Sequence, residues 1–149
     1  MVRKELSMKK RHIMNFGLMS FVLLGLLVTP QAVVAGDFDG SKPLLCAVIE
    51  TIECGPDSEC LRGEAESIDM PAFLKIDFAK KTISGTRQDG TVRTTEIKIL
   101  ERVGGNLILQ GVQNGKGWTM VISETTGKAT ITASDNQVGF VVFGACTGQ

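Results

Sequence analysis

Short apolar stretches separated by turn signals are the feature that most limits what this chain can fold into. From about residue 43 onward they recur at roughly the 8–12-residue spacing that is typical of all-β domains. The expected strands cover about 44–53, 73–78, 82–87, 91–101, 106–112, 117–123, 128–133 and 138–146.

The separators between these stretches contain the residues that tight hairpin turns require. Asp89-Gly90, Gly104-Gly105 and Asn114-Gly115 each place a residue that tolerates positive φ where two strands would meet. Consecutive strands joined by such turns are antiparallel neighbours. The sequence therefore predicts an antiparallel meander.

The apolar pattern within the stretches has the period of a strand. In 117–123, the side chains of Trp118, Met120 and Ile122 fall on one face, and more polar residues alternate with them. Residues 138–146 are apolar on both faces, which predicts a strand covered on two sides or one face left for a partner. Only 61–70 is ambiguous between a helical turn and an irregular crossover.

We expect residues 43–149 to form a single disulfide-bonded, all-β domain, preceded by a flexible segment at 36–42. A meander of about eight strands either closes on itself or exposes edges that invite aggregation. A small antiparallel barrel, closed or nearly closed, is therefore the favoured architecture. A two-sheet β-sandwich is the alternative.

Residues 1–35 have the three parts of a secretory signal peptide. A basic segment is followed by an apolar run from Phe16 to Val28 and by a small-residue exit that ends at Ala35. An uncleaved anchor is the alternative, but the run is shorter than the roughly 20 apolar residues of a spanning helix. We expect cleavage after Ala35 and a periplasmic or extracellular mature protein without a transmembrane segment.

The charge balance changes once the leader is set aside. Five of the chain's 16 cations and one of its 16 acidic residues lie in the leader, which leaves the remainder a net charge of −4. Nucleic acids and anionic membrane surfaces attract basic proteins. We therefore expect no nucleic-acid partner.

All four cysteines lie beyond the leader, and an even number in an exported chain indicates disulfides. Cys46 and Cys54 lie at the two ends of the first expected strand, where eight residues span roughly 26 Å, far beyond the reach of a disulfide. Cys54 and Cys60 flank a turn-rich loop, and barrel closure would set Cys46 beside Cys146. The pairs expected are Cys54–Cys60 and Cys46–Cys146.

Catalytic motifs are hard to find in this sequence. The only histidine, His12, lies in the leader, so the mature domain has no imidazole for a catalytic triad or a metal ligand. No spacing marks a nucleophile, a phosphate loop or a zinc site, and we expect no cofactor, no metal and no enzymatic activity. A hydrolase that uses a carboxylate pair is the remaining catalytic hypothesis.

Seven acidic residues lie between positions 50 and 69, opposed only by Arg62. They could form a cation site or an acidic contact surface, although the spacing of a calcium-binding loop is missing. A solvated acidic loop is the simpler interpretation.

Aromatic residues are the candidates for ligand or partner contact. Trp118 combines a large ring with a polar N–H and could line a ligand site or anchor the core. Phe140 and Phe143 lie in the apolar last strand and are further contact candidates. With Phe73 and Phe78, these two phenylalanines are also expected to fill the core.

Several segments resemble a group of small exported bacterial proteins without an assigned activity. They are Leu45–Glu50, Phe73–Phe78, Leu107–Gly111, Trp118–Ile122 and Phe143–Cys146. The resemblance covers nearly the whole mature chain and implies an exported β-rich protein, but no activity. The Trp-x-Met-x-Ile strand followed by Thr-Gly also resembles lipocalin-type barrels, although their Gly-x-Trp signature near the first strand is missing.

Two binding functions follow from this sequence. The first is a non-enzymatic envelope protein that contacts a partner through a sheet edge or through the apolar last strand. The second is a carrier that holds a small apolar ligand inside the barrel. Eight short strands enclose an interior that either fills with side chains or holds one small ligand, so an internal apolar cavity would favour the carrier.

Overall fold

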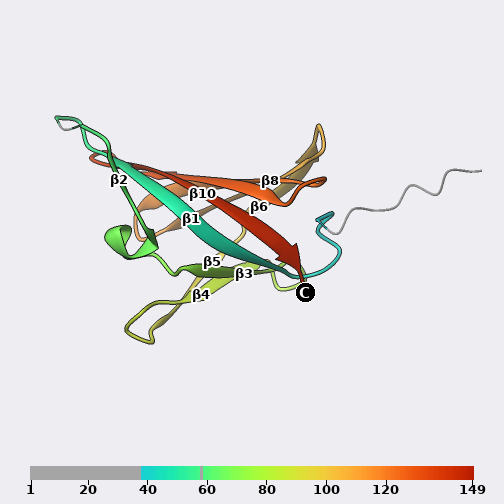
Figure 1. Cartoon of the computed structure of the whole chain (residues 1–149). Helices are drawn as coiled ribbons and strands as arrows, with labels where there is room; N and C mark the ends of the chain where they lie inside the picture. Colours follow the sequence, from blue (N-terminus) through green and yellow to red (C-terminus); the bar gives the residue numbers. More distant parts are fainter. Residues whose placement is uncertain (1–37, 58) are drawn as a thin grey trace, which may run out of the picture. The chain divides into compact units, whose positions relative to one another are not determined.

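Ten strands and one short 3-10 helix make up the computed structural model, which describes residues 38–57 and 59–149 (Figure 1). The leader expected at 1–35 lies outside the described residues. The elements are β1 (Leu44–Cys54), β2 (Leu61–Gly63), η1 (Ala65–Ile68), β3 (Phe73–Asp77), β4 (Thr82–Thr86), β5 (Val92–Glu96), β6 (Ile99–Val103), β7 (Asn106–Gln113), β8 (Lys116–Ser123), β9 (Lys128–Ser134) and β10 (Gly139–Gly148).

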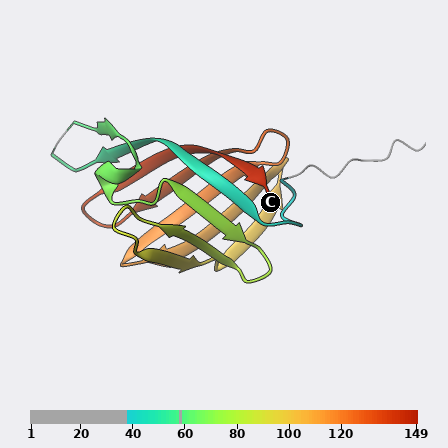
Figure 2. The ribbon, with the colours of Figure 1, turned by 60° about the horizontal axis from the view of Figure 1, so that its bottom comes forward.

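The strands form one antiparallel sheet in the order β5-β4-β3-β1-β10-β9-β8-β7-β6, and β2 pairs with the second half of β1. The run from β6 to β10 is the expected meander, and β10 returns to pair with β1. The sheet curls strongly, so that β3, β4 and β5 lie across from the strands that follow them in sequence (Figure 2). The all-β antiparallel prediction is therefore confirmed.

The sheet is an open half-barrel rather than a closed barrel. The single strand expected at 91–101 is divided at Ile97 and Lys98, with β5 paired to β4 and β6 paired to β7. Ile97 N–H donates to Lys81 O and Lys98 N–H donates to Gln110 O, each at 2.8 Å, so the chain crosses between the two edges within two residues. In the described part of the chain no strand ladder joins β5 to β7. We call the boundary between β5 and β7, where the backbones are not paired, the seam.

At one end of the curled sheet, buried aliphatic side chains fill the space between the strands. Leu107, Ile122 and Ala129 are directly opposite one another on β7, β8 and β9, and all are buried with Leu44 and Ile76. We call this part the filled end. Burial of several large aliphatic side chains at about 1.5–3 kcal/mol each makes it the main source of hydrophobic stabilisation.

The segment before β1 contributes to the filled end. Phe38 and Phe78 pack against the buried cluster, and the Phe38 ring lies so close to Gly127 that a Cβ there would approach it to 2.7 Å. Residues 36 and 37 of the segment expected to be flexible at 36–42 lie outside the described residues, and Phe38 of that segment packs against the core.

Two disulfides join the cysteines in the pairs selected by the strand geometry. Cys46 and Cys146 face each other in the β1–β10 ladder and are bonded there. Cys54 and Cys60 are bonded across the loop that follows β1. The adjacency of the first and last long strands, expected from barrel formation, is thus present in an open sheet.

The ambiguous segment 61–70 contains both a short strand and a helical turn. Thr51 is buried on β1, and its hydroxyl donates to Glu64 O at 3.0 Å and lies 3.3 Å from Ser67 Oγ. These contacts hold η1 against β1. Asp69 then ends the turn with φ of 59° and begins the return to β3. No helix among the described residues is long and apolar enough to cross a membrane.

Candidate functional site

A cavity of about 390 Å³ occupies the end of the curled sheet opposite the filled end. The strand register explains its origin, because Gly111, Trp118, Ala133 and Phe140 face one another across β7, β8, β9 and β10. Small and large residues alternate along this row. The aromatic side chains therefore form walls, and the small Ala133 leaves space between them. We call this part the hollow end.

Trp118 closes the cavity on the side of the seam. Its indole lies over Gly111, where an added Cβ would come within 2.4 Å of the ring, so only glycine fits. The indole N–H donates to Thr95 Oγ1 at 3.2 Å, and Thr95 belongs to β5 on the far side of the seam. One side chain thus bridges two strands that share no backbone ladder.

Apolar side chains form the floor of the cavity and separate it from the filled end. Met120 and Val142 are buried, and Ile131 between them on β9 is half-buried. Leu74 and Ile83 complete the floor from β3 and β4. An apolar cavity of this volume lies within the range of about 300–1,000 Å³ found for ligand sites.

Charged and amide side chains occur only at the mouth of the cavity. They come from the segment after η1, from β5 and from the β7–β8 turn. In the turn, the Gln113–Lys116 pair lies two residues along the strands from the Gly111–Trp118 pair. The polar mouth residues are Asp69, Arg93, Gln113, Asn114 and Lys116. The turn that carries three of them is fixed by Asn114 and Gly115, whose φ angles are 50° and 79°, as in the hairpin turn expected for Asn-Gly.

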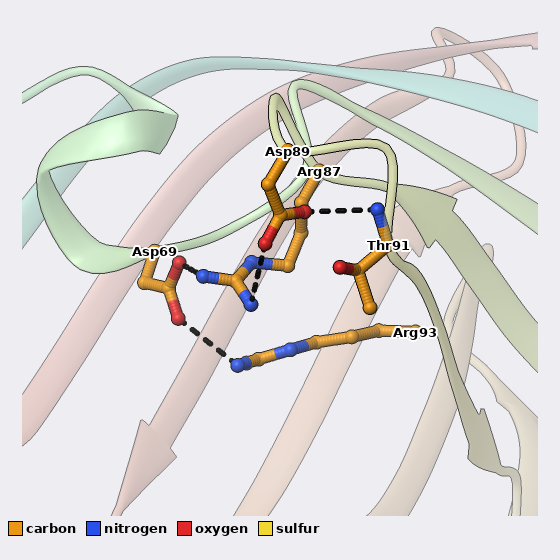
Figure 3. A network of polar contacts seen from close by, with 5 residues as sticks. All are labelled: Asp69, Arg87, Asp89, Thr91 and Arg93. Atoms are coloured by element: carbon orange, nitrogen blue, oxygen red, sulfur yellow. Dashed lines mark hydrogen bonds and ion pairs between the residues drawn. The ribbon is translucent and has the colours of Figure 1, made fainter.

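An ion-pair network holds the segment after η1 to the β4–β5 hairpin at the mouth (Figure 3). Arg87 lies between Asp69 and Asp89, pairing with the first and lying 3.6 Å from the second. Arg93 donates to the other oxygen of Asp69 at 2.9 Å. The backbone N–H of Thr91 donates to Asp89, which lowers the pKa of Asp89 below its usual value.

Lys116 and Asp135 form a second ion pair beside the mouth. The hydrogen bond from Lys116, with two more from the backbone N–H groups of Gln137 and Val138, lowers the pKa of Asp135 to about 2. Asp135 therefore stays ionised and fixes the β9–β10 turn. The Lys116 ammonium also lies 5.9 Å from the centre of the Phe140 ring, which keeps it at the rim of the cavity.

The structure brings two of the three aromatic contact candidates together. Trp118 and Phe140 both line the cavity. Phe143 is 39% exposed on the outer face of β10 and Phe73 is 59% exposed on β3, so the expectation that these two rings fill the core is wrong. Both side chains fall on the outward side of the strand alternation. Phe143 does not line the cavity and is left as a candidate for partner contact only.

The charged residues of the mouth were missed by sequence reasoning. Arg93 and Lys116 each lie two residues before an inward-facing residue, Thr95 and Trp118, so the period of two could have placed them on the cavity side. The position of Asp69 could not be predicted from this alternation, because Asp69 follows a helical turn and does not belong to a strand.

The acidic residues at 50–69 do not converge on one point. Glu50 pairs with Arg62 at 2.5 Å, and Asp69 belongs to the network at the cavity mouth. Within residues 38–57 and 59–149, no three acidic, cysteine or histidine side chains are grouped in a way that could hold a metal ion.

Comparison of the chain with protein-family models, with curated proteins and with solved structures found no match. The arguments for function therefore rest on the cavity and its surroundings.

Proposed function

We propose that this protein binds a small apolar molecule in the cavity at the hollow end of its curled sheet. The cavity itself carries the proposal: it measures about 390 Å³, its floor and walls are mainly apolar, and its charged and amide side chains lie at the mouth. Sites for small molecules commonly have this composition.

The cavity changes the order of the two binding hypotheses. The sequence favours partner contact, because its phenylalanines are expected to fill the interior. Since Phe73 and Phe143 point outward, that argument no longer holds. The role proposed is binding and carriage in an exported, oxidising compartment, which the two disulfides support.

A cavity-filling variant tests the proposal. Ala133 lies between Trp118 and Phe140 in the strand register, so Ala133→Phe places a ring in the space that the ligand would occupy. The matched control is Thr132→Phe, which adds the same ring to the adjacent, exposed position. Binding of the neutral apolar probe N-phenylnaphthylamine is followed by its own fluorescence.

We expect the probe to bind the native protein and the Thr132→Phe control, and to lose most of its affinity for Ala133→Phe. Thermal unfolding of each variant shows whether it is folded. Equal binding by both folded variants would place the probe elsewhere and contradict the proposal.

Partner contact remains a second proposal, favoured by the exposed edge strand β6. All five of its residues are exposed, including Ile99, Leu100 and Val103. An uncovered apolar edge is suited to pairing with another strand. A photoreactive residue at position 100 should crosslink a specific protein in intact cells, whereas the same residue at Lys128 should not.

A further inference from the structure

The distribution of charge at the cavity mouth limits the chemistry of the molecule inside. Three charged side chains line the cavity, and two of them, Arg93 and Lys116, are cations. The third, Asp69, is the only anion among them. The remaining polar mouth residues are the amides of Gln113 and Asn114.

Arg93 retains donors for a further acceptor. Its contact with Asp69 uses one nitrogen, Nη2, at 2.9 Å. A guanidinium carries several more N–H donors arranged to match a carboxylate. Asp69 is shared, because Arg87 pairs with its other oxygen. Arg87 also contacts Asp89, whereas the ion-pair contact of Arg93 is with Asp69 alone and uses one nitrogen, so Arg93 is not fully matched.

Lys116 has its counter-ion outside the cavity. Asp135 does not line the cavity, and one of its oxygens already accepts the backbone N–H groups of Gln137 and Val138 at 2.8 and 2.9 Å. An ammonium has three donors and no acceptor. The ammonium of Lys116, held near the Phe140 ring, can therefore donate toward the mouth while its pair with Asp135 remains.

From these contacts we infer that the molecule bound in the cavity is an amphipathic carboxylate, with its acidic head at Arg93 and Lys116 and its apolar part against Trp118 and the floor. This inference rests on the proposed function. A carboxylate head would give Arg93 the acceptor that Asp69 only partly supplies, and it would meet a lining that itself has two cations and one anion. An ammonium head would face both cations instead.

Three ten-carbon probes with different heads test this inference: decanoate, decanol and decylamine. Trp118 is the only tryptophan, and the chain has no tyrosine. Its emission therefore reports directly from the cavity wall. At neutral pH we expect decanoate to bind about tenfold more tightly than decanol, which corresponds to about 1.4 kcal/mol, and decylamine to bind most weakly.

The variants Arg93→Gln and Lys116→Gln should each reduce the preference for decanoate over decanol, and together should abolish it. Arg93→Lys retains the charge at this position without the planar fork and serves as the conservative variant. Arg102→Gln is the matched control, because Arg102 is an exposed arginine that pairs with Glu124 beside the filled end. It should leave the preference unchanged.

The outcomes separate the two proposals. If none of the three probes changes the Trp118 emission or binds by calorimetry, both the proposed function and this inference fail. Equal affinity for decanoate and decanol would overturn the inference alone. A preference that Arg102→Gln reduces as much as Arg93→Gln would reflect overall charge and would also overturn it.

Discussion

The two ends of the curled sheet are built from the same strands but differ in what lies between them. At the filled end, Leu107 and Ile122 face each other across the ladder and are fully buried. At the hollow end, the corresponding row pairs Gly111 with Trp118 and encloses a cavity. A change of side-chain size along these strands, without any change of backbone pairing, divides one sheet into a packed half and a half that encloses a cavity.

The disulfides provide the sharpest test of this division. Cys46–Cys146 closes 100 residues and lies in the buried cluster of the filled end, whereas Cys54–Cys60 closes only six. In the chain-entropy model the long bridge contributes about 4.7 kcal/mol and the short one about 2 kcal/mol. Replacing both cysteines of each pair by alanine should therefore lower the free energy of unfolding unequally.

Urea unfolding of the two double variants measures the difference. Alanine is used at both positions so that no unpaired thiol remains. If loss of the Cys54–Cys60 bridge proves the more costly, loop length does not decide the contribution of these two bridges, and the expected order is wrong.

Two isoleucines allow a matched comparison of packing. Ile122 is fully buried at the filled end, and Ile131 is half-buried on the cavity floor. Ile122→Ala should cost about 3–5 kcal/mol, within the upper range for buried isoleucine. Ile131→Ala should cost less, about 1–2 kcal/mol, because part of its surface already borders empty space.

Chemical denaturation of both variants decides the point. Equal losses would mean that the cavity floor is packed as tightly as the filled end, and the comparison would have to be abandoned.

The third expected effect, and the smallest, is a loss of stability in acid that arises at the β9–β10 turn beside the cavity mouth. The pKa of Asp135 is lowered to about 2, from 3.8, by Lys116 and by two backbone N–H groups. A carboxylate with a lowered pKa stabilises the fold above about pH 4, and this contribution disappears as the pH falls toward 2. The difference in unfolding free energy between the native protein and Asp135→Asn should therefore shrink over this interval.

Asp77 at the filled end is the control, since its pKa is lowered mainly by the backbone N–H of Lys80. Urea unfolding at several pH values compares Asp77→Asn with Asp135→Asn. A larger acid effect at Asp77 would show that the mouth turn is not the more strongly charge-dependent one.

Local pattern was enough to predict the strands and their antiparallel order. The period of two in 117–123 identified the inward face of β8 correctly, because side chains alternate strictly along a strand. The turn at Asn114 and Gly115 was equally accessible, since few residues other than asparagine and glycine adopt positive φ there.

The cavity could not be predicted in the same way. It depends on Gly111, Trp118, Ala133 and Phe140 facing one another, and that row exists only once the register of four strands is known. The division of 91–101 into β5 and β6 could not be predicted from the sequence either. The two parts differ in the strands they pair with, β4 for β5 and β7 for β6, and local sequence does not show this.

The seam has a consequence for how the molecule moves. The β4–β5 hairpin is joined to β3 by only three residue pairs, from Lys75–Ser84 to Asp77–Thr82, all in the first half of β4. Its other half is attached through side chains, among them Asp69 with Arg87 and Arg93. The hydrogen bond from Trp118 to Thr95, opposite Ile83, is a further side-chain attachment. Side-chain contacts can break and re-form without unfolding a ladder. The hairpin therefore has the connections of a flap, and its amide hydrogens should exchange with solvent sooner than those of β8 and β9, which are paired on both sides.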